Sequence, residues 1–203
     1  MHTNNPYAQA GWHNPANPLA YSQRHSTSAT TPPTFGALPA ASNALPTILE
    51  FKFTSYNPDI MNCLVYGPRN AQYFTISTDD TFPDTTTISK QGSQVVAVIE
   101  WHRHPIVEVK GQIPKQRAAQ WMPLSENQSS REMNVNGKQF AWVPQGSSLQ
   151  LFGTGTTSAQ QYAKLIRGAQ SLTLQLSTEA IQTGILEASV VAALLLQSGR
   201  HID

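Results

Sequence analysis

Three ionisable residues at alternate positions, Glu100, His102 and His104, have the spacing best suited to chemistry. Alternate positions of a β-strand share one face, and the apolar run over residues 94–104 predicts a strand that places Trp101 on the opposite face. Two imidazoles and a carboxylate presented together are suitable ligands for a metal such as zinc. The competing interpretation is that Trp101 faces the core and the three polar side chains face solvent. It is favoured because no second cluster completes the site, so these residues are weak metal candidates and we expect no cofactor.

Two further features resemble catalytic or ligand-binding elements. Cys63 could act as a nucleophile beside a histidine, but a lone cysteine in a short strand is more often a small buried apolar group. Residues 153–157, Gly-Thr-Gly-Thr-Thr, lack the Gly-Lys-Ser/Thr ending of a phosphate-binding loop, so a flexible connection is favoured. We therefore predict no catalytic residue, and a non-enzymatic protein is favoured over an enzyme.

The tryptophans divide into two groups. Trp101 and Trp142 lie in strand-like runs and are predicted to belong to the core. Trp121 lies beside Met122 and Pro123 in a polar, irregular stretch, so it is the better candidate for an exposed contact.

The elements that would hold these residues are mostly strands. Apolar and polar residues alternate over 48–54 and again over 172–176, which is the pattern of half-buried strands. Asn136-Gly137 between the runs 133–135 and 138–143 predicts a hairpin with a type I′ turn. Residues 161–167 are ambiguous between strand and helix, and residues 112–130 are expected to be irregular. About nine or ten strands without βαβ alternation indicate an antiparallel sheet.

One long helix is predicted after the last strand, over residues 179–198. Ser177 or Thr178 can cap its start, Gly199 can end it, and Gly184 weakens it locally. From residue 185 to 196 the only charged residue is Glu187, so the helix is apolar on all sides and must be enclosed. We therefore predict a mainly β fold: an antiparallel β-barrel or strongly curled sheet around a buried hydrophobic C-terminal helix.

The chain divides by composition into a tail and a domain. Residues 1–46 hold seven of the fourteen prolines and carry a single formal charge, Arg24. Such a segment cannot bury enough apolar area to offset its ordering, so we predict a disordered tail over 1–46 and one domain over 47–203. Within the domain, twelve basic residues balance twelve acidic ones. This balance argues against a nucleic-acid partner.

Location and membrane topology follow from two further observations. A single cysteine and the absence of a secretory signal fit an intracellular, cytoplasmic protein. A membrane span needs about 20 predominantly apolar residues, whereas the clean apolar run covers residues 188–196. A buried helix is therefore favoured over a tail anchor.

Several segments of the predicted strands resemble those of a known domain family. They are Ile99-Glu100-Trp101, Gly137-x-x-Phe140-x-Trp142, the Phe51 and Phe53 pair and the run 73–76. Over residues 48–200 the chain resembles an uncharacterised family abundant in basidiomycete fungi, which is similar in outline to the tubby C-terminal and LURP-one-like barrels. The resemblance implies a closed barrel around a hydrophobic central helix. Some tubby-type members bind phosphoinositide headgroups, but the dispersed basic residues here match no lipid motif.

Three functional hypotheses follow. The favoured one is a non-enzymatic binding or scaffold module whose outer loops engage a protein or a peripheral lipid. The alternatives are a metal-dependent enzyme that uses Glu100, His102 and His104, and a tail-anchored membrane protein. The sequence does not specify the ligand or the oligomeric state.

Overall fold

In the described residues, twelve strands and three α-helices form from the alternating runs and the apolar C-terminal segment. The computed structural model describes residues 48–79, 84–155, 160–169 and 171–203, all within one compact unit, Ala44–Asp203. The predicted disordered tail, 1–46, and part of the predicted loop at 153–158 lie outside the described residues. The strands of the first half are β1 (Ile48–Thr54), β2 (Cys63–Tyr66), β3 (Gln72–Asp79), β4 (Thr85–Lys90), β5 (Gln94–Glu100), β6 (Ile106–Val109) and β7 (Ile113–Arg117).

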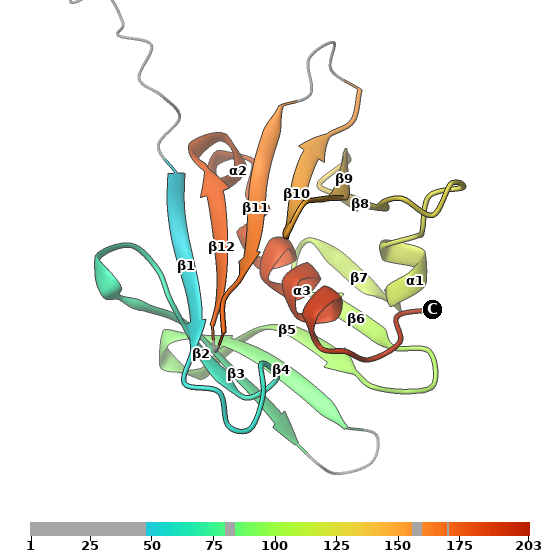
Figure 1. The fold of residues 1–203 in the computed structure, drawn as a ribbon. Coiled ribbons are helices and arrows are strands. Elements are labelled where there is room, and N and C mark those ends of the chain that lie inside the picture. Colours follow the sequence, from blue (N-terminus) through green and yellow to red (C-terminus); the bar gives the residue numbers. More distant parts are fainter. Residues whose placement is uncertain (1–47, 80–83, 156–159, 170) are drawn as a thin grey trace, which may run out of the picture. The chain divides into compact units, whose positions relative to one another are not determined.

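The second half begins with a short helix and ends with two more. Its elements are α1 (Ala118–Trp121), β8 (Arg131–Val135), β9 (Lys138–Gln145), β10 (Ser148–Gly153), β11 (Gln161–Arg167), β12 (Leu172–Ser177), α2 (Thr178–Gln182) and α3 (Leu186–Gln197). The ambiguous segment 161–167 is therefore a strand. Figure 1 follows the chain through these elements and shows α3 enclosed by the curled sheet.

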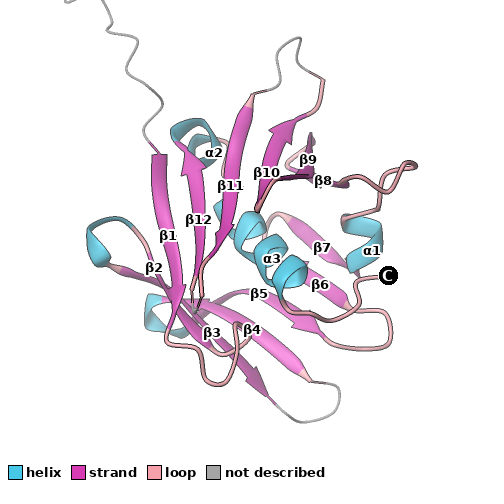
Figure 2. Ribbon diagram, in the orientation of Figure 1, coloured by secondary structure: helices cyan, strands magenta, loops and turns pink. Residues whose placement is uncertain are grey.

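All the strand pairs are antiparallel and belong to one sheet. The strand order is β7-β6-β5-β4-β3-β2-β1-β12-β11-β10-β9-β8, so β1 lies beside β12 and the two edge strands are β7 and β8. The sheet curls into a nearly closed barrel around the C-terminal helix, which confirms the predicted fold class. Figure 2 shows α1 in the connection between the two edge strands.

The hairpin of β8 and β9 is determined by the local sequence of its turn, as predicted. Asn136 and Gly137 have φ values of 53° and 75°, and Val135 pairs with Lys138 across them. Both central residues of a type I′ turn need positive φ, which asparagine and glycine adopt most easily. Met133 and Phe140 are then opposite each other, and both are buried.

The interior of the sheet is filled by α3. Eight consecutive residues of this helix, 188–195, are buried, and they include Val190, Leu194 and Leu195. Phe51 and Phe53 of β1 pair with Leu174 and Leu172 of β12, and all four are buried. An apolar helix enclosed by the apolar face of a sheet removes both surfaces from water, which is the main favourable contribution to folding.

The predicted single helix over 179–198 is wrong in length. It is divided into α2 and α3, because Gly184 has a φ of +73° and cannot continue a right-handed helix. The cap was predicted correctly, since the Ser177 hydroxyl accepts a hydrogen bond from Ala180 N at 3.2 Å. The twelve residues of α3 span about 18 Å. In the described part of the chain, no helix is long and apolar enough to cross a membrane.

Two strand predictions are also corrected. β5 ends at Glu100, not at residue 104, because Glu100 pairs with Ile106 of β6 and residues 101–105 are needed for the connection. Residues 113–117, expected to be irregular, form β7. Its polar sequence, Pro-Lys-Gln-Arg after Ile113, hides the strand pattern because an edge strand buries little of its surface.

Arg200 and Asp203 contact residues at the ends of three strands, β4, β5 and β8. The Arg200 guanidinium carbon lies 4.9 Å from the centre of the Trp101 ring, and its Nη2 lies 3.0 Å from a carboxylate oxygen of Asp84. The Asp203 carboxylate accepts hydrogen bonds from both terminal nitrogens of Arg131, the first residue of β8. These contacts tie the end of α3 to both sides of the barrel.

Candidate functional site

The filled interior moves the candidate site to the outer surface. Three grooves of about 350, 270 and 260 Å³ are formed by residues at the surface and rims of the sheet. The first lies beside β1, the second lies where α3 ends and is lined by Tyr56 and Arg167 among others, and the third lies between β7 and β8.

The first of these three grooves exists because β1 is longer than its neighbour on one side. Residues Ile48–Phe53 pair with β12, whereas β2 pairs only with Lys52–Thr54. Beyond Tyr66 the chain leaves β1 in a turn over 67–70, where Arg69 and Asn70 have φ values of 60° and 55°. The edge of β1 at residues 48–51 therefore faces a groove of about 350 Å³ instead of a strand.

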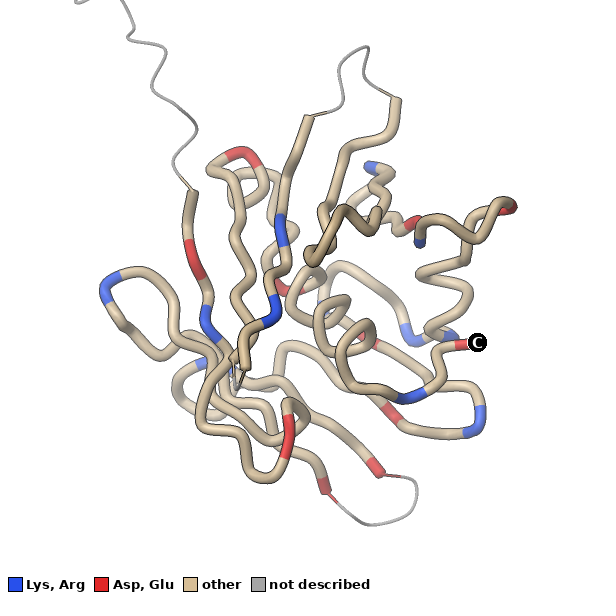
Figure 3. Tube along the Cα trace, viewed as in Figure 1, with Lys and Arg blue, Asp and Glu red and all other residues tan. Residues whose placement is uncertain are grey.

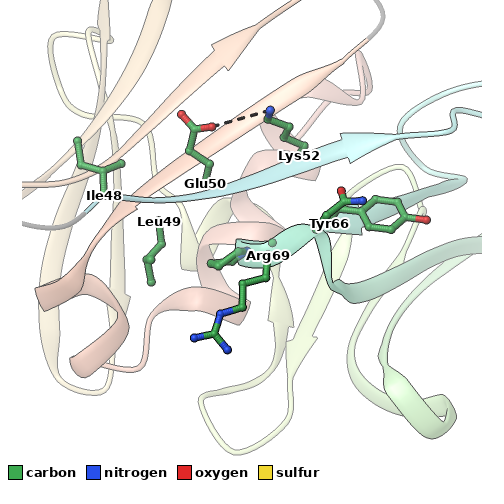
Figure 4. Close-up of a pocket in the computed structure, with 9 residues that line it drawn as sticks. Ile48, Leu49, Glu50, Lys52, Tyr66 and Arg69 are labelled. Carbon is green, nitrogen blue, oxygen red and sulfur yellow. Dashed lines mark ion pairs between the residues drawn. The ribbon is translucent and has the colours of Figure 1, made fainter.

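The side chains of this groove, which we call the β1 groove, are of mixed character (Figure 4). Ile48 is 58 % exposed. Lys52 Nζ lies 4.0 Å from a Glu50 carboxylate oxygen, and both side chains are about half exposed. Figure 4 shows Lys52 and Arg69 directed to opposite sides of β1, so the two cations do not converge on one point. The groove offers apolar surface, both signs of charge and a free strand edge.

The structure does not bring the predicted metal candidates onto one strand face. Glu100 is the last residue of β5, while His102 and His104 lie exposed in the following connection. A Glu100 carboxylate oxygen lies 3.3 Å from His102 Nε2, and the Lys115 ammonium donates to the other oxygen. The hydrogen bond from Lys115, together with that from His102, outweighs desolvation and lowers the pKa of Glu100.

The prediction that one strand face carries the three residues is therefore wrong. Among the described residues, no group of three or more His, Cys, Asp or Glu side chains is arranged to hold a metal ion. The favoured interpretation, that these three residues are solvent-facing side chains without a metal, stays a prediction, and metal analysis of the untagged protein tests it.

Cys63 lies in an environment that suppresses thiolate chemistry. The side chain is buried, and its sulfur donates to the Ile60 carbonyl oxygen at 3.1 Å. Burial, with a smaller contribution from the negative charge of Asp59, raises the pKa of Cys63 to about 12. Since the thiolate is the nucleophile, the buried position of Cys63 favours the interpretation of this residue as a small buried apolar group.

Trp101 and Trp142 are buried, which confirms the core prediction, but the exposed contact predicted for Trp121 is wrong. Trp121 is 3 % exposed, and its indole nitrogen donates to the Asn134 carbonyl oxygen at 3.2 Å.

In the β1 groove, neither Lys52 nor Arg69 had any distinguishing signal in the sequence. The Gly67-Pro68 turn marks the end of β2, but only the unequal pairing of β1 reveals the groove beside it.

Comparison with known proteins gives a family and a distant structural likeness. Residues 58–201 match the model of a family described as "Family of unknown function (DUF6593)". The search of curated proteins finds no match. The X-ray structure of a protein from Arabidopsis thaliana is similar with a TM-score of 0.42 and 9 % sequence identity, over 72 % of this chain and 90 % of that chain. A likeness of this size carries no inference about function.

Proposed function

The chain belongs to DUF6593, a family of unknown function, and we propose that it is a non-enzymatic binding or scaffold module whose partner is another protein. The observation that carries this proposal is the filled interior. Residues 188–195 of α3 occupy the space in which a barrel would otherwise hold a small ligand. Recognition then falls to the outer surface, where the β1 groove is the largest of the three grooves described above.

A protein is favoured over an anionic lipid because of how the charges are distributed. Figure 3 shows lysine and arginine residues scattered over the sheet, with acidic residues among them. Within the β1 groove, Lys52 lies beside Glu50, and Arg69 points to the other side of the strand. A polybasic membrane surface needs several cations on one face, whereas exposed apolar surface with polar side chains around it has the anatomy of a protein interface.

Several finer predictions belong to this proposal. They are the similarity to tubby C-terminal and LURP-one-like barrels, a fungal origin, an intracellular and cytoplasmic location, and the division into a tail over 1–46 and a domain over 47–203. The nearly closed barrel around α3 supports the first of them. The others rest on composition and on the resemblance of the sequence.

Site-specific photo-crosslinking in native cell extract tests the choice of partner. A photo-reactive amino acid placed at Lys52 or at Tyr66 is expected to give the same discrete protein adduct, because both side chains line the β1 groove. The matched control is the same amino acid at Arg103 or Gln145, which are exposed and line none of the three grooves. A protein adduct of equal strength at the control positions would contradict the proposal.

Sedimentation with vesicles tests the lipid alternative. Vesicles of neutral lipid and vesicles that also contain phosphatidylserine or a phosphoinositide are expected to retain the protein equally poorly. If the anionic vesicles retained it and the variant Lys52→Gln/Arg69→Asn lost about 2 kcal/mol of binding, the partner would be a membrane instead. Asparagine is chosen at position 69 because it tolerates the positive φ found there.

A further inference from the structure

The barrel is not closed by strand pairing between its two edge strands, β7 and β8. We call the gap between these two strands the seam. These strands follow each other in the sequence, joined by α1 and the segment 122–130, but they stand at opposite ends of the strand order. Figure 2 shows them near each other, with α1 at one end of the seam. A sheet edge presents unpaired N–H and C=O groups, which can pair with another extended chain.

Along one half of the seam, the segment that precedes β8 in the chain pairs with the edge of β8 in an extended conformation. Glu132 N donates to the Pro123 carbonyl oxygen at 3.0 Å, and Leu124 forms an antiparallel bridge with Arg131. The Arg131 guanidinium also donates to the Met122 carbonyl oxygen at 2.9 Å. The first half of the β8 edge therefore already binds a short antiparallel segment of polypeptide.

The other half of the seam is the groove of about 260 Å³, which we call the seam groove. Five of its nine lining residues carry side-chain amides, namely Gln112, Gln116, Gln120, Asn134 and Asn136, and none of the nine is charged. Side-chain amides donate and accept hydrogen bonds, as a peptide backbone does. The Oε1 atom of Gln112 is buried without a hydrogen-bond partner in the described part of the chain.

The backbone of β8 continues into the seam groove. Because Val135 pairs with Lys138 across the two-residue turn, hydrogen bonding to β9 alternates along β8. The N–H and C=O of Asn134 therefore point away from β9, toward the seam. The carbonyl accepts from Trp121 Nε1 at 3.2 Å, and a carbonyl oxygen has a second lone pair.

From these observations we propose that the seam groove binds a short, extended and uncharged segment of another polypeptide, antiparallel to β8, by strand addition. The chain's own residues 122–125 occupy the adjacent part of the same edge in this manner. An anionic ligand is disfavoured by the absence of a cation among the nine lining residues. A sugar is disfavoured because Trp121 is 3 % exposed and offers no free ring face.

This site goes beyond the function proposed above, since it shares no lining residue with the β1 groove. The failure of one proposal therefore leaves the other intact. The probe is a capped peptide of alternating threonine and glutamine, added to the isotope-labelled full chain and followed by NMR. We expect saturable changes in the amide chemical shifts of Gln116, Gln120 and Asn134, with a Kd of about 1 mM.

Two controls make the result specific to strand addition. The same peptide with a fully N-methylated backbone cannot form a ladder and should cause no shift. The variant Gln116→Glu/Asn134→Asp should bind about tenfold more weakly, because it loses two amide donors and places charge in the groove. The matched variant Gln145→Glu/Gln161→Glu, at exposed positions of β9 and β11 away from the seam groove, should bind like the parent chain.

Four outcomes would overturn the proposal. They are no shift at about 5 mM peptide, equal shifts with the N-methylated peptide, shifts with maltose but not with the peptide, and shifts of the same amides on protein dilution alone. The third would indicate a sugar site. The fourth would indicate that a second copy of the chain occupies the seam groove.

Discussion

The inner and outer faces of the curled sheet differ in the burial of their side chains and in the role of those side chains. Inside, residues such as Phe53, Leu174 and Leu194 are fully buried and are removed from water by α3 and the sheet together. Outside, the β1 groove and the seam groove are lined by polar and partly exposed residues. This difference indicates that the inner face determines stability and the outer face determines recognition. Substitutions inside should change the melting temperature, and substitutions in the grooves should change binding alone.

The largest expected effect comes from a charge placed inside the barrel. Leu195→Asp should abolish cooperative thermal unfolding, because Leu195 is 1 % exposed and an unpaired buried carboxylate costs several kcal/mol. That cost is comparable with the whole stability of a domain, about 5–15 kcal/mol. Circular dichroism and calorimetry measure the transition.

The neighbouring residue supplies the control for this substitution. Leu196 belongs to the same helix but is only partly buried. Leu196→Asp should therefore keep a cooperative transition at a moderately lower temperature. Equal melting curves for the two variants would show that α3 is not enclosed.

A smaller effect is expected at the break between α2 and α3. Gly184→Ala should destabilise the protein by about 1 kcal/mol, since alanine at a φ of +73° is strained. An added Cβ would have room, because the nearest atom outside the chain neighbours, Asn136 Nδ2, is 3.7 Å away. The expected loss in melting temperature is about 2–4 °C.

The variant Gly184→Asn tests whether backbone strain causes the loss of stability expected for Gly184→Ala. Gly184→Asn should cost less than Gly184→Ala, because asparagine adopts left-handed conformations more readily. If Gly184→Ala raised the melting temperature instead, the two helices would be continuous in solution.

The smallest effect concerns the acid side of the stability profile. Burial of Glu187 opposes ionisation, but hydrogen bonds from Lys90 and Gln112 outweigh it and lower the pKa below its ordinary value of 4.5. The folded state therefore binds the proton less tightly than the unfolded state. Its stabilising contribution is present above pH 4.5 and is lost as the pH falls through the lowered pKa.

The variant Glu187→Gln should remove this part of the pH dependence. Chemical denaturation between pH 3 and pH 6 gives the free energy of unfolding, and the slope below about pH 4.5 should be shallower in the variant. Glu126→Gln, at an exposed loop position, should leave the slope unchanged. An identical slope in Glu187→Gln and the parent would contradict the assigned hydrogen bonds.

Features set by neighbouring residues were predictable from the sequence. The Asn136-Gly137 turn, the alternating strand 172–176 and the Ser177 cap each depend on residues within a few positions of one another. The enclosure of α3 was predictable for a related reason. A helix that is apolar on all sides has no stable solvent-facing orientation, so its burial follows from composition alone.

The candidate site was much less predictable, because it depends on which strands pair. The metal hypothesis assumed that the strand of Glu100 extends to His104, but pairing with Ile106 requires a turn between them. Trp121 appeared exposed because polar residues surround it in sequence, whereas α1 places it against β8. Neither groove has a sequence signature, since each is a place where a neighbouring strand is missing.

The amino-acid sequence by itself determined the secondary structure of most segments and the need to enclose the C-terminal helix, because periodicity and turn chemistry are local. Only the tertiary structure decided where the sheet ends. The strands β7 and β8 are identified as edges by the pairing of all the other strands, which the sequence does not reveal. Unpaired backbone and groove geometry follow from that long-range choice. The surfaces available for recognition were therefore set by strand order, which depends on contacts between residues far apart in the chain.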